Sequence, residues 1–449
     1  MSKFIDRPRY TCALGGALIA LRALPRTIPI IHASSGCGFN VSNATTAGAG
    51  YLGGGYCGGT SASSTNVVER EIVFGGEERL AEQIQTTLEI IDGDLYVVIT
   101  GCMVEMIGDD ISVSTNKFAA AGVPVLPIPT PSFRGTSYEG YDMLLSGLFR
   151  LYTTKGRQHR KNRVNLWGLP PGQDIFYKGN LTEFRRLLGR IGLDAYTFFG
   201  EGEPLSNLQN AADASLNIIL SDTYGLKSAE VFEEVHGTPW ISVPLPIGAS
   251  QTANFLRTVA QALKIPDAEV EQVIAEEDAR YYDYMERLAD IYNDADLQRY
   301  AVITGDANYA PSVARFVSDD LGWVPRLVVI TDSLEPDDTE SRATLLARFE
   351  GWESDIRPEV RFDTDASAVV KYLPEAWEPN HNERYYNSLT PLVLIGSVFE
   401  RDLAIKLNAP LLTLSFPATN RVILNQAYAG YNGGLTFMAD LFSALLVGR

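Results

Sequence analysis

The four cysteines of this 449-residue chain lie close to its beginning. They are Cys12, Cys37, Cys57 and Cys102, and the rest of the chain holds none. A deprotonated thiol is a strong nucleophile and a ligand for soft metals and iron–sulfur clusters. In a chain without signs of export, cysteines are more often metal-binding or catalytic than paired in disulfides. The crowding therefore predicts a thiol site in the first part of the chain.

Cys12, Cys37 and Cys102 are spaced too widely for the commonest cysteine sites. Structural zinc takes its ligands in local Cys-x2-4-Cys pairs, and the sequence has none. A catalytic cysteine needs a histidine base. None of the four histidines sits in a recognisable nucleophile motif: they are His32, His159, His236 and His381. A simple iron–sulfur cluster takes four thiolates, so three cysteines suggest a cluster completed by a partner chain. Three unrelated buried thiols are the alternative.

Two of these cysteines follow predicted strands. The hydrophobic runs 28–32 and 95–100 read as short buried strands, and they break just before Cys37 and Cys102. In an open α/β sheet, ligands bind beyond the carboxyl ends of the strands. Both thiols are therefore expected where a ligand would bind. We expect His32, which ends the first strand, to be structural.

Hydrophobic strands alternate with amphipathic helices along the whole chain. The further predicted strands are 164–168, 216–220, 240–245, 300–305, 326–331, 391–396 and 410–415. This alternation predicts an α/β fold of three doubly wound, parallel-sheet, Rossmann-like domains. The expected boundaries are 1–160, which holds the cysteines, 161–298 and 299–449.

Two segments need separate interpretation. The acidic stretch 267–299 is predicted to be a linker helix that closes the second domain, with its charges on a solvated face. The glycine-rich stretch 47–59 surrounds Cys57 and lacks the Gly-Lys-Ser/Thr ending of a phosphate-binding loop. We interpret it as a flexible loop, because glycine permits many backbone shapes without specifying chemistry.

The charge and hydropathy exclude several classes of partner. A net charge of −18 argues against nucleic-acid binding, and no run reaches the length of ~20 apolar residues needed to span a membrane. The first residues lack the apolar core of a signal peptide, so the cytoplasm is the expected location.

Five separated motifs in the first third of the chain occur in an order typical of one family. They are Cys12, Ile30-Ile-His-Ala-Ser-Ser-Gly-Cys37, Val73-Phe-Gly-Gly-Glu77, Thr100-Gly-Cys-Met-Val-Glu-Met-Ile-Gly-Asp-Asp110 and Thr130-Pro-Ser-Phe-Arg-Gly135. Together they resemble the nitrogenase component 1 superfamily, and the β-type subunit most closely. The resemblance extends to the closing segments Ser415-Phe-Pro417 and Gly430-Tyr-Asn-Gly-Gly434. It implies the nitrogenase component 1 fold.

The resemblance also implies partners and a cofactor. It implies an α2β2 heterotetramer in which each αβ pair shares a P-cluster-type 8Fe–7S centre. Cys12, Cys37 and Cys102 match the three cysteine ligands of the β-type subunit, and Ser132 matches a serine that joins the cluster on oxidation. Phe74 matches an aromatic residue at the docking surface for the ATP-hydrolysing iron protein. Cys57 matches no ligand, and we expect it to be structural.

The implied role is electron relay in an oxidoreductase, without catalytic residues in this chain. The α-type subunit holds the substrate-reducing cofactor with a cysteine and a late histidine, whereas this chain has no cysteine after Cys102 and no histidine after His381. Only eleven residues precede Cys12, and the Ala-, Gly- and Ser-rich flanks of Cys37 and Cys57 differ from those of the three familiar nitrogenases. These differences favour a methylthio-alkane reductase. The alternatives are a dinitrogen-reducing alternative nitrogenase and a cofactor-assembly scaffold.

Overall fold

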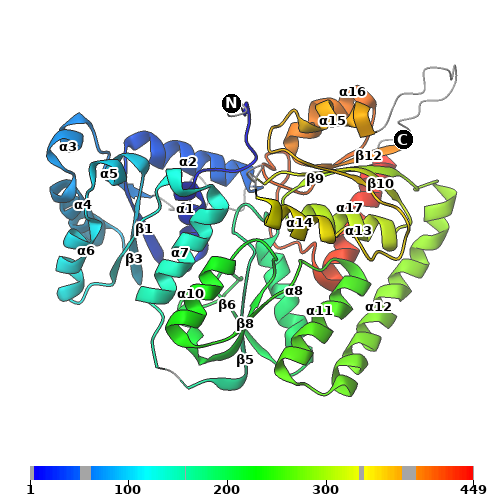
Figure 1. The fold of residues 1–449 in the computed structure, drawn as a ribbon, viewed down its shortest axis with the longest axis horizontal. Coiled ribbons are helices and arrows are strands. Elements are labelled where there is room, and N and C mark those ends of the chain that lie inside the picture. Colours follow the sequence, from blue (N-terminus) through cyan, green and yellow to red (C-terminus); the bar gives the residue numbers. More distant parts are fainter. Residues whose placement is uncertain (1–4, 51–61, 157, 333–337, 377–390, 448–449) are drawn as a thin grey trace.

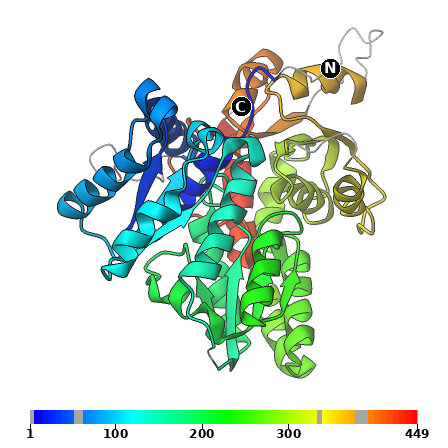
Figure 2. The same cartoon turned by 60° about the vertical axis from the view of Figure 1, so that its left-hand side comes forward.

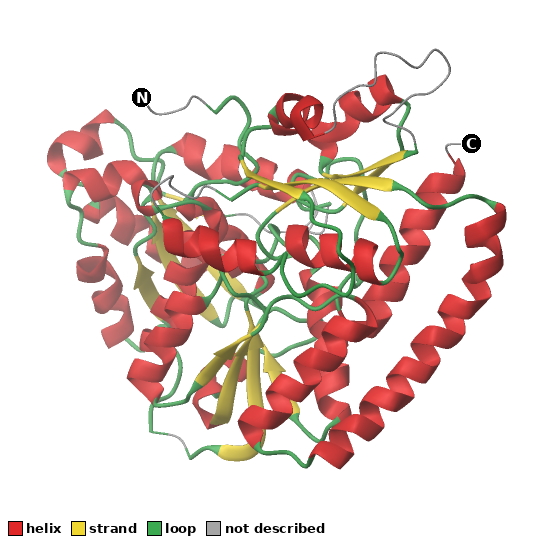
Figure 3. Ribbon diagram, turned by 45° about the vertical axis from the view of Figure 1, so that its right-hand side comes forward, coloured by secondary structure: helices red, strands yellow, loops and turns green. Residues whose placement is uncertain are grey.

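The computed structural model describes residues 5–50, 62–156, 158–332, 338–376 and 391–447. Residues 51–59 of the glycine-rich stretch, with Cys57, and the segment with His381 fall outside these ranges, so the predictions for them stay predictions. Residues 47 and 48, predicted to begin the loop, instead end helix α2 (Ser35–Gly48). All strand pairs of the three sheets are parallel, and helices cover the sheets (Figures 1 and 3). The predicted α/β class with three parallel sheets is confirmed. Within the described parts of the chain, no helix is long and apolar enough to span a bilayer.

The first sheet carries the cysteines. Its strand order is β2-β1-β3-β4, with β1 at Thr27–His32, β2 at Ser63–Ser64, β3 at Leu95–Thr100 and β4 at Val125–Ile128. Helices α1 (Ala13–Ala23) and α7 (Ser137–Leu151) pack on one face, and α4 (Glu77–Ile90) and α6 (Ile111–Ala120) on the other. Both faces are covered, which explains why β3 is buried along its whole length and reads as one hydrophobic run.

The second sheet has the strand order β6-β5-β7-β8. These strands are β5 (Arg160–Trp167), β6 (Asp194–Thr197), β7 (Ala214–Ile219) and β8 (Trp240–Ser242), and the main helices are α8 (Tyr177–Arg190), α10 (Leu226–His236) and α11 (Gly248–Leu263). Helix α10 packs on α7 and so joins the first two sheets. The sequence does not predict β6, because β6 is a four-residue edge strand in which buried and exposed residues are mixed.

The third sheet has five described strands in the order β11-β10-β9-β12-β13. The strands are β9 (Tyr300–Gly305), β10 (Val324–Ile330), β11 (Glu359–Phe362), β12 (Leu392–Gly396) and β13 (Leu411–Thr413), with helices α13 (Tyr309–Asp319), α14 (Thr339–Ala347), α15 (Ala368–Ala376) and α16 (Arg401–Leu407). The closing helix α17 (Gly430–Val447) packs on α8 and α11 of the second sheet and touches β13. Figure 2 shows it running between these two sheets.

The predicted acidic helix is present as α12 (Asp267–Asp294), but its charges are not all solvated. The Glu277 side chain is fully buried and accepts hydrogen bonds from Arg186, Arg190 and Arg280. Burial by itself would raise the pKa of Glu277, but the hydrogen bonds from the three guanidinium groups lower it to about 2. The ion pairs of this buried carboxylate with Arg186 and Arg190 therefore hold α12 against α8.

Buried polar side chains fill the place where the three sheets meet. Tyr138 of α7 stacks on Tyr224, with ring centroids 4.3 Å apart, and the Tyr224 hydroxyl donates to Asp332, just beyond β10. Asp332 also accepts a 2.8 Å hydrogen bond from the Ala307 N–H. Burial raises the pKa of Asp332 to about 7, and the nearby charge of Asp306 adds to the effect. In this chain, side chains occupy the strand-end junction where α/β proteins often bind ligands.

Candidate functional site

The three predicted cysteine ligands lie along one edge of the first sheet. Cys12 caps the N-terminus of α1, Cys37 lies in the first turn of α2 (Ser35–Gly48), and Cys102 begins α5 (Cys102–Ile107). Helices α2 and α5 follow the carboxyl ends of β1 and β3, and α1 starts at the same edge because it runs back to the start of β1. We call this the thiol edge.

Gly101 brings the Cys37 and Cys102 segments into contact. Its N–H donates a 2.9 Å hydrogen bond to the carbonyl of His32. A Cβ at position 101 would lie only 2.6 Å from the Ala33 Cβ and 3.9 Å from the Cys37 Sγ. A side chain at this position would therefore push apart the two strand ends that carry the thiols.

Cys12 and Ser132 are brought to the same edge by the crossing of α1 and α7. Cys12 forms an isolated antiparallel bridge with Thr136, and the Ser137 N–H donates to the Thr11 carbonyl at 2.8 Å. Ser132 begins a short 3-10 turn (Ser132–Arg134) just before this bridge and is partly exposed. The predicted serine ligand therefore lies on the segment that is paired with Cys12.

The thiols suit a cluster better than a single metal ion. Cys12, Cys37 and Cys102 are free thiols, and each is partly accessible. In the described ranges, no three His, Cys, Asp or Glu side chains stand close enough together to hold one ion. Thiolates spread along an edge fit an iron–sulfur cluster, in which different irons take different ligands, and they leave ligand positions for a second chain.

Phe74 lies on a turn beside the thiol edge. It ends α3 (Glu69–Phe74), and 84% of it is exposed. Gly75 follows with φ +89°, a conformation that favours glycine, and the chain then enters α4 through Gly76. We call residues 74–76 the docking turn. Val68, Val73 and Met106 nearby are also largely exposed.

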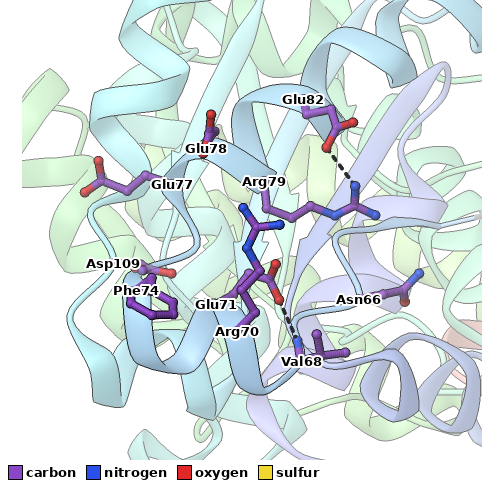
Figure 4. A pocket seen from close by; sticks show the side chains of 11 residues that line it. Asn66, Val68, Arg70, Glu71, Phe74, Glu77, Glu78, Arg79, Glu82 and Asp109 are labelled. Atoms are coloured by element: carbon purple, nitrogen blue, oxygen red, sulfur yellow. Dashed lines mark hydrogen bonds and ion pairs between the residues drawn. The ribbon is translucent and has the colours of Figure 1, made fainter.

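A charged groove of about 950 Å³ opens beside Phe74 between α3 and α4 (Figure 4). Arg79 pairs with Glu82 at 2.7 Å, and Glu71 accepts a 3.0 Å hydrogen bond from the Val68 N–H. The surface therefore combines an exposed aromatic side chain with charges of both signs. Such a combination is typical of a polar, transient protein interface rather than a permanent one.

A buried histidine–aspartate pair links the docking turn to the thiol edge. His32 Nδ1 lies 3.1 Å from Thr65 Oγ1, and its Nε2 lies 3.1 Å from Asp109 Oδ2. Both Asp109 oxygens accept from the Gly76 N–H, at 3.0 and 2.9 Å. Burial lowers the pKa of His32, although the hydrogen bond and the charge of Asp109 oppose the effect. The structural role expected for His32 did not include this pairing with Asp109.

The fold and the thiol edge define a three-sheet α/β protein with a thiol site. The sequence matches the family described as Nitrogenase component 1 type Oxidoreductase over residues 12–446. The chain therefore belongs to this family of oxidoreductases, whose members bind iron–sulfur clusters, and the predicted resemblance is confirmed at the level of the family.

The relatives found by sequence are nitrogenase β chains. The molybdenum-iron protein β chain of Sinorhizobium fredii is 27% identical over 465 residues, which cover 98% of this chain and 84% of the relative. The vanadium-iron protein β chain of Trichormus variabilis is 24% identical, with coverage of 96% and 91%. A solved structure titled "Nitrogenase Cp1 at pH 6.5" superposes with a TM-score of 0.78 at 20% identity and covers 100% of this chain and 94% of that one.

Proposed function

We propose that this chain is the β subunit of a nitrogenase-like two-component reductase and relays electrons to a catalytic α subunit. The observation that carries the proposal is the thiol edge, where Cys12, Cys37 and Cys102 stand free at one end of the first sheet. The family match and the β-chain relatives support the same role.

The three thiolates would hold a P-cluster-type 8Fe–7S centre together with ligands from the α subunit of an α2β2 heterotetramer. When bound, the cluster supplies one-electron transfer. Ser132, on the segment paired with Cys12, would add an oxygen ligand in the oxidised state. Burial and hydrogen bonds around the thiolates would set the potential of the centre. The filled three-sheet junction agrees with a substrate-reducing cofactor held in the α subunit.

Metal and sulfide analysis tests the relay role. The chain is co-expressed with its α partner, purified without oxygen, and assayed for iron and acid-labile sulfide, with EPR spectra recorded after graded oxidation. A relay subunit requires about eight irons per αβ pair beyond the partner's own cofactor. About four irons would indicate a simpler cluster and favour an assembly scaffold, and no iron would contradict the proposal.

We expect Phe74→Ala to weaken electron delivery without removing iron. An exposed aromatic residue at the centre of an interface contributes roughly 2 kcal/mol to binding, so ATP-coupled reduction is expected to fall by about 30-fold at limiting iron protein. The measurement is product formation against iron-protein concentration. Ile405→Ala is the matched control, because Ile405 is 70% exposed on α16, near the third sheet. Unchanged coupling in Phe74→Ala would overturn the docking assignment.

The favoured substrate class is methylthio-alkanes, with cleavage of a C–S bond, and dinitrogen is the alternative. Identities of 27% or less to the molybdenum and vanadium β chains support a distinct reductase. The test is to supply the complete two-component enzyme with a methyl thioether and, separately, with dinitrogen. Methane or methanethiol formation supports the first substrate class, and ammonia formation supports the second.

A further inference from the structure

We propose that His32 and Asp109 are positioning residues that couple the docking turn to the strand ends carrying Cys37 and Cys102. The inference rests on the proposed function, since it says how a displacement caused by a partner that docks at Phe74 reaches the thiol edge. Cys37 follows His32 by five positions, and Asp109 follows Cys102 by seven. The pair therefore belongs to the same two segments as the thiols.

At the docking turn, Gly76 is packed tightly against Asp109 and His32. The Gly76 N–H is held by both oxygens of Asp109. A Cβ at position 76 would lie 2.5 Å from Asp109 Oδ2 and 2.9 Å from His32 Cε1. The backbone of the turn therefore packs directly against the carboxylate and the imidazole at Gly76, two residues after Phe74, whose side chain is 84% exposed. A partner that presses on Phe74 acts on this peptide.

At the thiol edge, hydrogen bonds connect His32 to the chain at the ends of both β1 and β3. Its carbonyl accepts from the N–H of Gly101, the residue before Cys102. Thr65, the second partner of its imidazole, also accepts a 3.2 Å hydrogen bond from the N–H of Ala33, at the start of the Cys37 segment. A shift of the imidazole therefore displaces hydrogen bonds that fix the backbone that leads into Cys102 and into the Cys37 segment.

The link is buried along its whole length, which allows it to transmit a displacement. The side chain of His32 is 0% exposed and that of Asp109 only 5%. A buried donor or acceptor that loses its partner destabilises the folded chain. When the docking turn moves, moving the pair with it costs less than breaking its hydrogen bonds.

Hydrogen exchange of the complete heterotetramer, with and without the iron protein held by a non-hydrolysable ATP analogue, tests the coupling. In the wild type we expect docking to slow exchange in residues 69–80 and also, by about tenfold, in residues 28–37 and 98–104. In Asp109→Asn the response of 28–37 and 98–104 is expected to fall below about twofold, while that of 69–80 stays. In either orientation, the asparagine NH2 group takes the place of a carboxylate oxygen and faces the Gly76 N–H, a donor that it cannot accept from.

Asp110→Asn is the matched control. It removes the same charge one residue further on, and asparagine serves as well as aspartate in the cap that residue 110 provides for α6. We expect this variant to respond like the wild type. His32→Gln, which removes the other half of the pair, provides a second test if Asp109→Asn is poorly folded.

Four outcomes would overturn the coupling. The first is a full response of 28–37 and 98–104 in both Asp109→Asn and His32→Gln. The second is loss of iron in these variants, which would make the pair an assembly feature. The third is loss of protection at 69–80 in the variants alone, which would mean that the pair is needed for the iron protein to dock. The fourth is an absence of protection at 69–80 in the wild type, which would instead contradict the proposed function and the coupling with it.

Discussion

Cys37→Ala is expected to abolish the shared cluster and, with it, all ATP-dependent reduction by the complex. A cluster that loses one of its thiolates loses a covalent anchor. The hydroxyl that contacts this thiol, Ser34 Oγ at 3.5 Å, is a harder and weaker ligand for iron–sulfur centres than a thiolate. The fold should survive, because Cys37 is only partly buried and truncation to alanine removes a single atom. The measurements are iron per αβ pair, reductase activity and the melting temperature.

Cys57→Ala is the natural control for this substitution. It makes the same chemical change at the one cysteine that matches no ligand of the family. It is expected to keep full iron content and turnover. If Cys37→Ala also kept them, the assignment of the thiol edge would be wrong; if Cys57→Ala lost them, the ligand set would be incomplete.

The positions of the thiols follow from local sequence. Buried parallel strands read as short hydrophobic runs, so 95–100 could be recognised as a strand and Cys102 placed beyond its carboxyl end. The edge strands β6 and β11 could not be recognised, because each has only four residues and neither shows a regular alternation of buried and exposed positions.

The pairs that hold the site together could not be predicted from sequence. Asp109, His32 and Gly76 come from separate segments, and only packing brings a carboxylate, an imidazole and a backbone N–H into line. The same holds for Glu277, which belongs to an acidic run typical of a solvated helix face. Its burial depends on arginines about 90 positions earlier in the chain.

Arg9 connects the segment that bears Cys12 to the third sheet. Its side chain is buried, as is that of Glu400, and the two form an ion pair. Arg9 also donates to Ser397 Oγ at 2.7 Å and to the Ala366 carbonyl at 3.4 Å. Figure 1 shows the N-terminal segment running beside the third sheet. The segment that carries Cys12 is therefore attached to residues 357 to 391 positions further along the chain than Arg9.

Arg9→Met is accordingly expected to destabilise the protein by roughly 3–5 kcal/mol, because it leaves the Glu400 carboxylate buried without its partner. Iron content should fall as well, since the segment before Cys12 loses its attachment. Thermal unfolding and iron analysis measure the two effects. Arg7→Ala is the matched control, because Arg7 is largely exposed and its ion pair with Asp6 contributes little.

The double variant Arg9→Met, Glu400→Gln removes the unpaired charge of Glu400 and should recover much of the stability. If iron returned together with stability in the double variant, Arg9 would act on Cys12 through folding alone. If stability returned and iron did not, the attachment of Arg9 to the third sheet would itself set the position of the ligand.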